Sequence, residues 1–131
     1  MTTEKTIKLF LRLAISFSFL SAVADRFGWW PERYTVWGNW ENFLTYTKLI
    51  NPWFPDIFIQ PLAILATGAE IGLSLCLIVG FKTQLAAKLS GALLLLFALS
   101  MTFSTGIKGA FDYSVFTASA GAFALSLLRD K

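Results

Sequence analysis

Apolar residues fall into four long segments along the chain, separated by shorter polar stretches. These segments run from about residue 7 to 27, 57 to 81, 83 to 105 and 109 to 128. A helix needs about 20 apolar residues to cross the hydrocarbon core of a bilayer, and each segment is near that length. Only helices and closed barrels satisfy backbone polar groups in lipid, and the segments are too continuous for barrel strands. The pattern therefore predicts an all-α chain with four transmembrane helices.

The connectors between the later segments are short. Gly80-Phe81-Lys82 joins the second to the third, and residues 106–109 join the third to the fourth. Short connections force neighbouring helices to run antiparallel, so we expect an up-and-down four-helix bundle. One integral membrane domain spanning residues 1–131 is the simplest organisation.

Small residues recur at every fourth position in three of the segments, which allows helices to approach closely. The repeats are Ala14, Ser18 and Ala22 in the first, Gly68, Gly72, Cys76 and Gly80 in the second, and Ser114, Ala118, Ala122 and Ser126 in the fourth. They mark contacts either within the bundle or between two copies of it.

The long connector from residue 28 to 56 is rich in aromatic side chains and holds all five tryptophans. Within it, Asn39 is placed to cap a short helix that Asn51-Pro52 would end. Two interpretations remain open: a helix resting in the headgroup region of a membrane, or an aromatic lid over a cavity between the helices. The tryptophans proposed for the lid are Trp29, Trp30, Trp37 and Trp40.

Composition agrees with lipid as the solvent, since 56% of residues are hydrophobic and only 15% are charged, against about 25% in soluble domains. The chain has no histidine, which removes histidine-ligated haem, most zinc sites and the Ser-His-Asp triad. Its single cysteine, Cys76, cannot form an internal disulfide. No catalytic set and no metal site are expected, and enzymatic activity of the chain alone is uncertain.

Basic residues suggest an orientation, because Lys and Arg concentrate on the cytoplasmic side of bacterial membrane proteins. One side would carry Lys5, Lys8, Arg12, Lys82, Lys88, Arg129 and Lys131, and the other Arg26, Arg33, Lys48 and Lys108. Both termini are therefore expected in the cytoplasm and the 28–56 loop outside. The basic residues form no block of the kind that binds nucleic acid, so no nucleic-acid partner is expected.

Glu70 is the only charged residue in the second segment. A carboxylate at that depth costs about 3 kcal/mol unless it is protonated, paired or hydrated. Thr67 and Ser74 share its helix face, at i−3 and i+4. We expect a polar seam facing the interior, with Glu70 either bonded to Arg12 or held neutral by burial.

A second polar cluster is expected at the outer side, where Asp25 and Arg26 end the first segment and Asp112 and Tyr113 begin the fourth. Two interpretations remain open here as well. The residues either form ion pairs that fix helix ends, or they are the polar wall of a pocket for a small amphipathic ligand, such as a quinone or a lipid.

With these residues in view, the chain resembles the DoxX family of small bacterial membrane proteins. The residues that carry the resemblance are Leu20-Ser21-Ala22-Val23-Ala24-Asp25-Arg26-Phe27-Gly28, Trp37-Gly38-Asn39-Trp40, Phe43-Leu44-Thr45-Tyr46-Thr47, Glu70 with Gly72, Gly80-Phe81-Lys82-Thr83 and Asp112-Tyr113-Ser114. The resemblance implies a four-helix inner-membrane protein with a link to quinone-dependent redox systems.

The leading expectation is a non-catalytic subunit, or a quinone- or lipid-binding module, of a membrane redox system. A structural or chaperone-like assembly protein and a small proton-coupled transporter are the alternatives. No cofactor ligated by the protein is expected. Expected partners are the lipid bilayer, redox proteins and a second copy of the chain.

Overall fold

The computed structural model describes residues 2–129, and these residues form helices, turns and connecting loops with no strand. The expected all-α class is confirmed for this part of the chain. The long helices are α1 (Thr3–Arg26), α3 (Ile59–Val79) and α4 (Thr83–Ser104). Shorter ones are α2 (Trp40–Ile50), α5 (Ile107–Asp112) and α6 (Val115–Leu127), with the 3-10 turns η1 (Glu32–Tyr34) and η2 (Asp56–Phe58).

The fourth apolar segment, expected as one helix over about 109–128, is divided in two. Ser114 lies between α5 and α6 with φ 57°, in the left-handed region, which interrupts the helical hydrogen-bond ladder. The Ser114 N–H donates instead to the carbonyl of Phe111 at 3.0 Å. With 13 residues, α6 is about 20 Å long, shorter than the roughly 30 Å hydrocarbon core.

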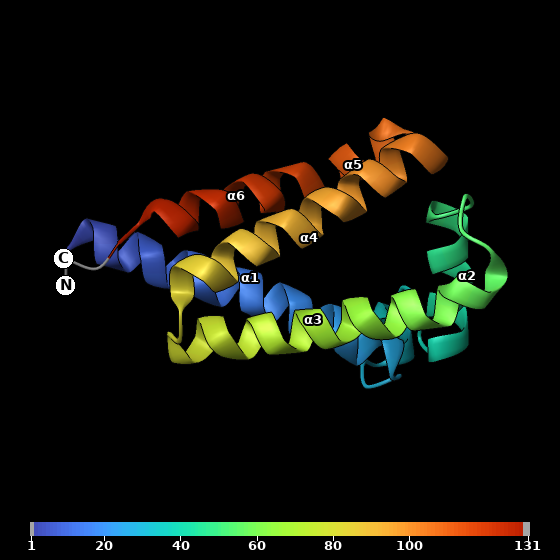
Figure 1. The fold of residues 1–131 in the computed structure, drawn as a ribbon. Coiled ribbons are helices and arrows are strands. Elements are labelled where there is room, and N and C mark those ends of the chain that lie inside the picture. The colour runs from blue at the N-terminus through green and yellow to red at the C-terminus, as the bar shows by residue number, and fades with distance from the viewer. Residues whose placement is uncertain (1, 130–131) are drawn as a thin grey trace.

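The helices diverge from one end of the molecule to the other. Helices α3 and α4 are joined by a tight turn at one end and separate toward the other, where α2 lies (Figure 1). Helix α4 packs most extensively against α6, and α1 packs against α3 and α6. The start of α1, the end of α6 and the α3–α4 turn lie at the same end of the molecule (Figure 1).

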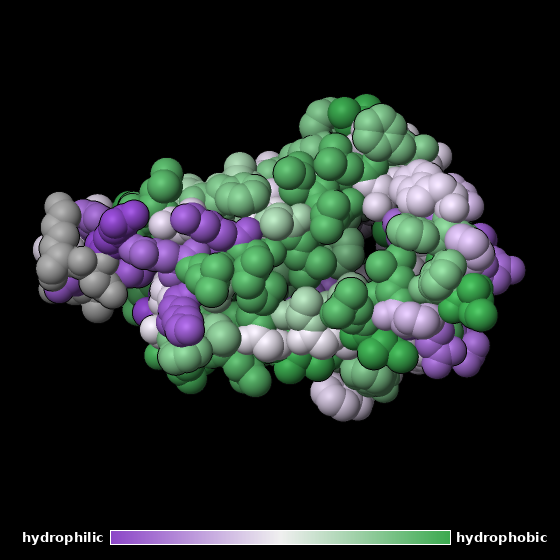
Figure 2. All heavy atoms as spheres, viewed as in Figure 1, coloured by the Kyte–Doolittle hydropathy of each residue, from purple (hydrophilic) through white to green (hydrophobic). Residues whose placement is uncertain are grey.

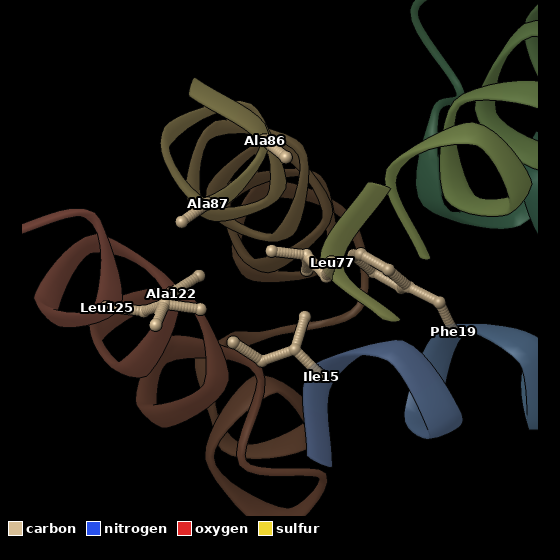
Figure 3. Packing of buried hydrophobic residues seen from close by; sticks show 7 residues of the cluster. All are labelled: Ile15, Phe19, Leu77, Ala86, Ala87, Ala122 and Leu125. Carbon is tan, nitrogen blue, oxygen red and sulfur yellow. The ribbon is translucent and has the colours of Figure 1, made fainter. Parts of the chain in front are cut away.

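The largest apolar core occupies the narrow end, where the four longer helices meet (Figure 3). It contains Ile15, Phe19, Leu77, Ala86, Ala87, Ala122 and Leu125. Small side chains bring α4 close to α6: a Cβ added to Gly91 would lie 2.9 Å from the Phe123 ring. The Ser119 hydroxyl also donates to the Gly91 carbonyl at 2.8 Å.

The small-residue repeats therefore separate into two kinds. Ala122 and Ser126 of the fourth segment are buried inside the molecule. Gly68 and Gly72 on α3 are exposed, and a Cβ added to either would meet nothing within 4 Å. At Gly68 and Gly72, the small-residue repeat on α3 therefore makes no close contact with another helix of the molecule.

Much of the surface seen in Figure 2 is hydrophobic, and the hydrophilic residues gather toward the two ends of the molecule. Large side chains such as Phe10, Leu65, Leu96 and Phe103 are more than half exposed. Among the described helices, three are long and apolar enough to cross a membrane: Thr3–Arg26, Asp56–Val79 and Thr83–Ser104.

Candidate functional site

The last residue of α1 pairs with the acid in the middle of α3. A guanidinium nitrogen of Arg26 donates to Glu70 Oε1 at 2.9 Å, and its other terminal nitrogen donates to the Thr67 hydroxyl at 2.7 Å. The two charged residues are 2% and 1% exposed. Glu70 thus faces the interior, as expected, and it is an ion-pair member.

Aromatic rings cover the same guanidinium. Its central carbon lies 3.8 Å from the centroid of the Phe43 ring and 5.3 Å from that of the Trp37 ring. Rings at these distances stabilise a cation through their quadrupole, more strongly where water is excluded. Arg26 therefore joins α1, α3, α2 and the preceding loop in one contact.

The expected partner of Glu70, Arg12, lies elsewhere. Arg12 donates from Nε to the Leu77 carbonyl at 2.7 Å and from a terminal nitrogen to the Ile78 carbonyl at 2.9 Å. These carbonyls belong to the last turn of α3, where a cation complements the helix dipole. The prediction of a Glu70–Arg12 bond is wrong, and Arg12 caps a helix end instead.

The register between α1 and α3 explains why Arg26, and not Arg12, reaches Glu70. Arg12 is level with the end of α3, and Ser16 exchanges hydrogen bonds with Ser74, at 3.2 and 3.3 Å. Arg26 is about 21 Å farther along α1 than Arg12, at about 1.5 Å per residue. That rise brings its long side chain to the level of Thr67 and Glu70. The expectation had instead placed Arg26 far from Glu70, at the outer end of the helices.

A polar seam does run between α1 and α3. Ser16, Thr67, Glu70 and Ser74 are all buried on the facing sides of these helices. The Ser74 hydroxyl also donates to the Glu70 carbonyl at 2.6 Å. Most of these hydrogen bonds end on backbone carbonyls, so the seam joins two helices along their length.

Asp25 holds the loop that follows α1. Its carboxylate accepts the backbone N–H groups of Val36 at 2.8 Å, Trp37 at 3.3 Å and Gly38 at 2.9 Å. Gly28 makes the close return possible, since its φ is +73° and an added Cβ would lie 2.9 Å from the Gly38 carbonyl oxygen. Asp25 therefore fixes the position of Trp37.

The two residues expected from the start of the fourth segment do not join this cluster as expected. Asp112 pairs with Lys108 at 2.7 Å on the surface, one helical turn away. Tyr113 is 71% exposed and is one of the residues that line a large cavity. Of the four residues in the expected cluster, Arg26 and Tyr113 line the same cavity, whereas Asp25 binds the loop after α1 and Asp112 pairs with Lys108.

The cavity lies between the diverging helices α3 and α4 and is bounded by α2 at the wide end of the molecule. Its volume is about 1110 Å³. Apolar side chains of α3 and α4 form most of its walls, among them Leu62, Ala66, Ala69, Leu93, Leu96 and Phe97. A dark opening is visible in the surface at this end (Figure 2). Polar side chains also line the cavity, among them Arg26, Trp37, Tyr46 and Asn51, with Ser100 on α4 and Tyr113 before α6.

Of the four tryptophans expected in a lid, Trp37 alone lines this cavity. Trp40 stacks on Phe27 with ring centroids 5.8 Å apart, and Trp29 packs against the same ring at 5.5 Å. Trp30 donates from Nε1 to the Ser21 carbonyl of α1 at 3.1 Å. Trp53, which was not proposed for the lid, does line the cavity.

Sequence reasoning missed the residues of α2 that close the cavity. Phe43, Thr47 and Ile50 are buried on one face of α2 and line the cavity. Their i, i+4, i+7 spacing was a readable signal of a buried helical face. The short helix itself was expected, and Asn39 caps it by accepting the Asn42 N–H at 2.8 Å.

The polar groups near Asn51 are satisfied within the protein. Ser100 of α4 donates to Asn51 Oδ1 at 3.0 Å, and Asn51 donates to the Thr47 carbonyl at 3.0 Å. Burial, with the neighbouring Tyr113 second, raises the pKa of the Tyr46 phenol above its usual range. Tyr46 therefore stays a neutral phenol at physiological pH.

Within the described part of the chain, three buried side-chain polar atoms have no hydrogen-bond partner: Arg26 Nε, Trp37 Nε1 and Glu70 Oε2. Unpaired buried groups are rare in proteins because each one costs free energy. Among the described residues, no group of three or more His, Cys, Asp or Glu side chains is placed to hold a metal ion.

The arrangement is thus a large, mostly apolar cavity with a polar corner, formed by the neighbouring side chains of Arg26 and Trp37. Comparison of the chain with protein-family models, with curated proteins and with solved structures finds no match.

Proposed function

We propose that the chain is an integral membrane protein that holds one long-chain amphipathic molecule between α3 and α4. The observation that supports the proposal most directly is the cavity of about 1110 Å³, with mostly apolar walls and a few polar side chains. Ligand sites of this type bury an apolar body and orient it with a few polar groups. The exposed apolar surface and three long apolar helices support a membrane location.

The proposed topology has four crossings, made by α1, α3, α4 and the α5–α6 pair, arranged as an up-and-down bundle in the bacterial inner membrane. Lys5, Lys8, Arg12 and Lys82 gather at the end where α1 begins and where α3 turns into α4 (Figure 1). The excess of basic residues in cytoplasmic loops favours that end as the cytoplasmic one. Lys131, which supported this orientation, lies outside the described residues.

The proposed role is that of a non-catalytic binding module. The resemblance to the DoxX family supports a place in a quinone-linked redox system, with a quinone or a lipid as the bound molecule. Reduction or oxidation of that molecule would be the work of a partner protein, because the described part of the chain offers no redox pair of its own.

The test is a comparison of three purified proteins in mild detergent: wild type, Ala69→Phe and Ala120→Phe. Ala69 lines the cavity, so the added ring fills it, whereas Ala120 is an exposed residue of α6 outside the cavity. Mass spectrometry of extracted small molecules is expected to find the same long-chain compound in wild type and Ala120→Phe, and at least fivefold less in Ala69→Phe. Equal amounts in all three proteins would contradict the proposal.

A structural role in membrane assembly is the second candidate, favoured by the buried Arg26–Glu70 pair that ties α1 to α3. In that case the cavity would be the docking site of a partner helix or of ordinary bilayer lipid. Mild-detergent purification would then yield a stoichiometric partner protein and no enriched small molecule.

A further inference from the structure

Two hydrogen-bond donors in the cavity wall lack an acceptor within the protein. Arg26 and Trp37 both line the cavity, and Arg26 Nε and Trp37 Nε1 are buried without an acceptor. Arg26 is 2% exposed, and its guanidinium carbon lies 5.3 Å from the centroid of the Trp37 ring. Two unpaired N–H groups therefore lie in one corner of the same cavity.

Two acceptors in this region are engaged with protein donors, whereas the hydroxyls of Tyr46 and Tyr113, which also line the cavity, can either donate or accept. Thr67 accepts from Arg26, and Asn51 accepts from Ser100. Glu70 Oε2 also lacks a partner, but Glu70 does not line the cavity. A head group in this corner thus meets donors that need an acceptor.

The charge of the corner is already balanced. Arg26, the only cation among the described residues that line the cavity, pairs with Glu70 at 2.9 Å. An anionic head group would add a buried charge without a counter-ion, and a cationic head would face a cation and N–H donors. A neutral acceptor fits both the charge and the hydrogen bonds.

We propose that the occupant of the α3–α4 cavity carries a neutral carbonyl head group, which accepts hydrogen bonds from Arg26 Nε and Trp37 Nε1 while its chain lies between the two helices. This inference rests on the proposed function and adds the chemical class of the head. A carbonyl of this kind occurs in the ester of a lipid and in the ring of a quinone. Tyr46 packs on Trp37, with ring centroids 5.7 Å apart, and closes the corner on the α2 side.

The test measures displacement of tritiated methyl hexadecanoate from the whole protein in nanodiscs, with Ala69→Phe defining non-specific uptake. Competitors share the hexadecyl chain and differ in the head: methyl ester, 1,4-benzoquinone, alcohol, carboxylate and amine. We expect the ester and the quinone to compete at least tenfold better than the carboxylate and the amine, and several-fold better than the alcohol. The tighter of the two carbonyl compounds identifies the source of the head group.

A variant pair tests the named donor. Trp37→Phe keeps a ring beside Arg26 and removes the Nε1–H, and it is expected to weaken ester binding about fivefold, the effect of one hydrogen bond. Trp29→Phe makes the same change at a tryptophan outside the cavity and is expected to leave binding unchanged. The relative affinities of the competitors for the wild-type protein are measured without any variant, so they test the proposal even if Trp37→Phe folds poorly.

Two failures are distinguishable. Equal binding of the ester to wild type and Ala69→Phe would overturn the proposed function together with this inference. Binding that Ala69→Phe removes, but that is as strong for the carboxylate, the amine or the alcohol as for the ester, would leave the function standing and overturn the carbonyl assignment. Unchanged ester affinity in a folded Trp37→Phe protein would overturn it as well.

Discussion

At the scale of single residues, the Arg26–Glu70 pair is the interaction that most determines the site. Both side chains are almost fully buried, and the guanidinium also contacts Thr67, Phe43 and Trp37. Removing one member of a buried pair leaves an uncompensated charge, whereas losing an exposed pair changes little. Replacing the buried Glu70 by its amide is therefore expected to cost much more stability than the same replacement at the exposed Asp112.

Glu70→Gln is expected to lower the free energy of unfolding by about 3 kcal/mol, because Arg26 loses its counter-charge. Asp112→Asn is the matched control, since its pair with Lys108 lies on the surface, and a change below about 1 kcal/mol is expected there. Chemical unfolding in detergent, followed by circular dichroism, measures both. Equal stability of the two variants would show that the pair is unimportant.

Asp25 acts through the loop that it holds. Asp25→Asn removes the charge and one of the two acceptor oxygens, so the N–H groups of Val36, Trp37 and Gly38 lose strong bonds. Hydrogen exchange at these amides is expected to become at least tenfold faster, while amides of α4 keep their rates. Unaltered exchange over residues 36–38 would mean that other contacts fix the loop.

At the scale of secondary-structure elements, the α4–α6 interface depends on a glycine. A Cβ on Gly91 would lie 2.9 Å from the Phe123 ring, whereas a Cβ on Gly68 would meet nothing within 4 Å. Both glycines lie inside helices, so alanine brings the same gain in helix propensity, up to about 1 kcal/mol.

Gly91→Ala is therefore expected to destabilise the protein by about 1 to 2 kcal/mol through overpacking, while Gly68→Ala is neutral or stabilising. Thermal unfolding of the two variants in the same detergent checks the difference. Adding Phe123→Ala to Gly91→Ala removes the clash and is expected to recover part of the loss. A stabilised Gly91→Ala protein would show that α4 and α6 are less closely packed than described.

The helices themselves were largely predictable from the sequence, because their apolar runs are long and the turn at Gly80 is short. Capping of α2 by Asn39 was also predictable from residue type and spacing. The break before α6 was not, since no proline or glycine stands at Ser114 to signal it. Tertiary context can override local propensity in this way, and the residue types around Ser114 carry no sign of it.

The partner of Glu70 was unpredictable for a related reason. Its burial followed from one charge in a long apolar run, but the partner depends on how far α1 slides along α3. That register is set by contacts such as Ser16 with Ser74, which the apolar pattern does not specify. Arg12 and Arg26 both belong to α1, and only the register of α1 against α3 decides which of them reaches Glu70.

At the scale of the whole molecule, the distribution of charge predicts how the chain sits in a membrane. In a Cys76→Ser background, Lys82→Cys is expected to react with an impermeant maleimide only from the cytoplasmic side, and Tyr34→Cys only from the outer side. Both positions are exposed, so access depends on the side alone. Labelling of both from the same side would rule out the proposed topology.

The divergence of α3 and α4 is the other feature at this scale, because it creates the cavity to which the proposed function is tied. Helices that are linked by a short turn usually stay in contact along their length, as expected for an up-and-down bundle. Here α2 lies at the open end, and its buried face of Phe43, Thr47 and Ile50 closes the cavity. The apolar pattern predicted the helices, but it did not predict that two neighbours would separate.

The most direct test of this account is an experimental structure of the protein in lipid nanodiscs, without added ligand. The account predicts elongated density between α3 and α4, with one end in contact with Arg26 and Trp37. A structure in which α3 and α4 close against each other, with no density between them, would contradict it.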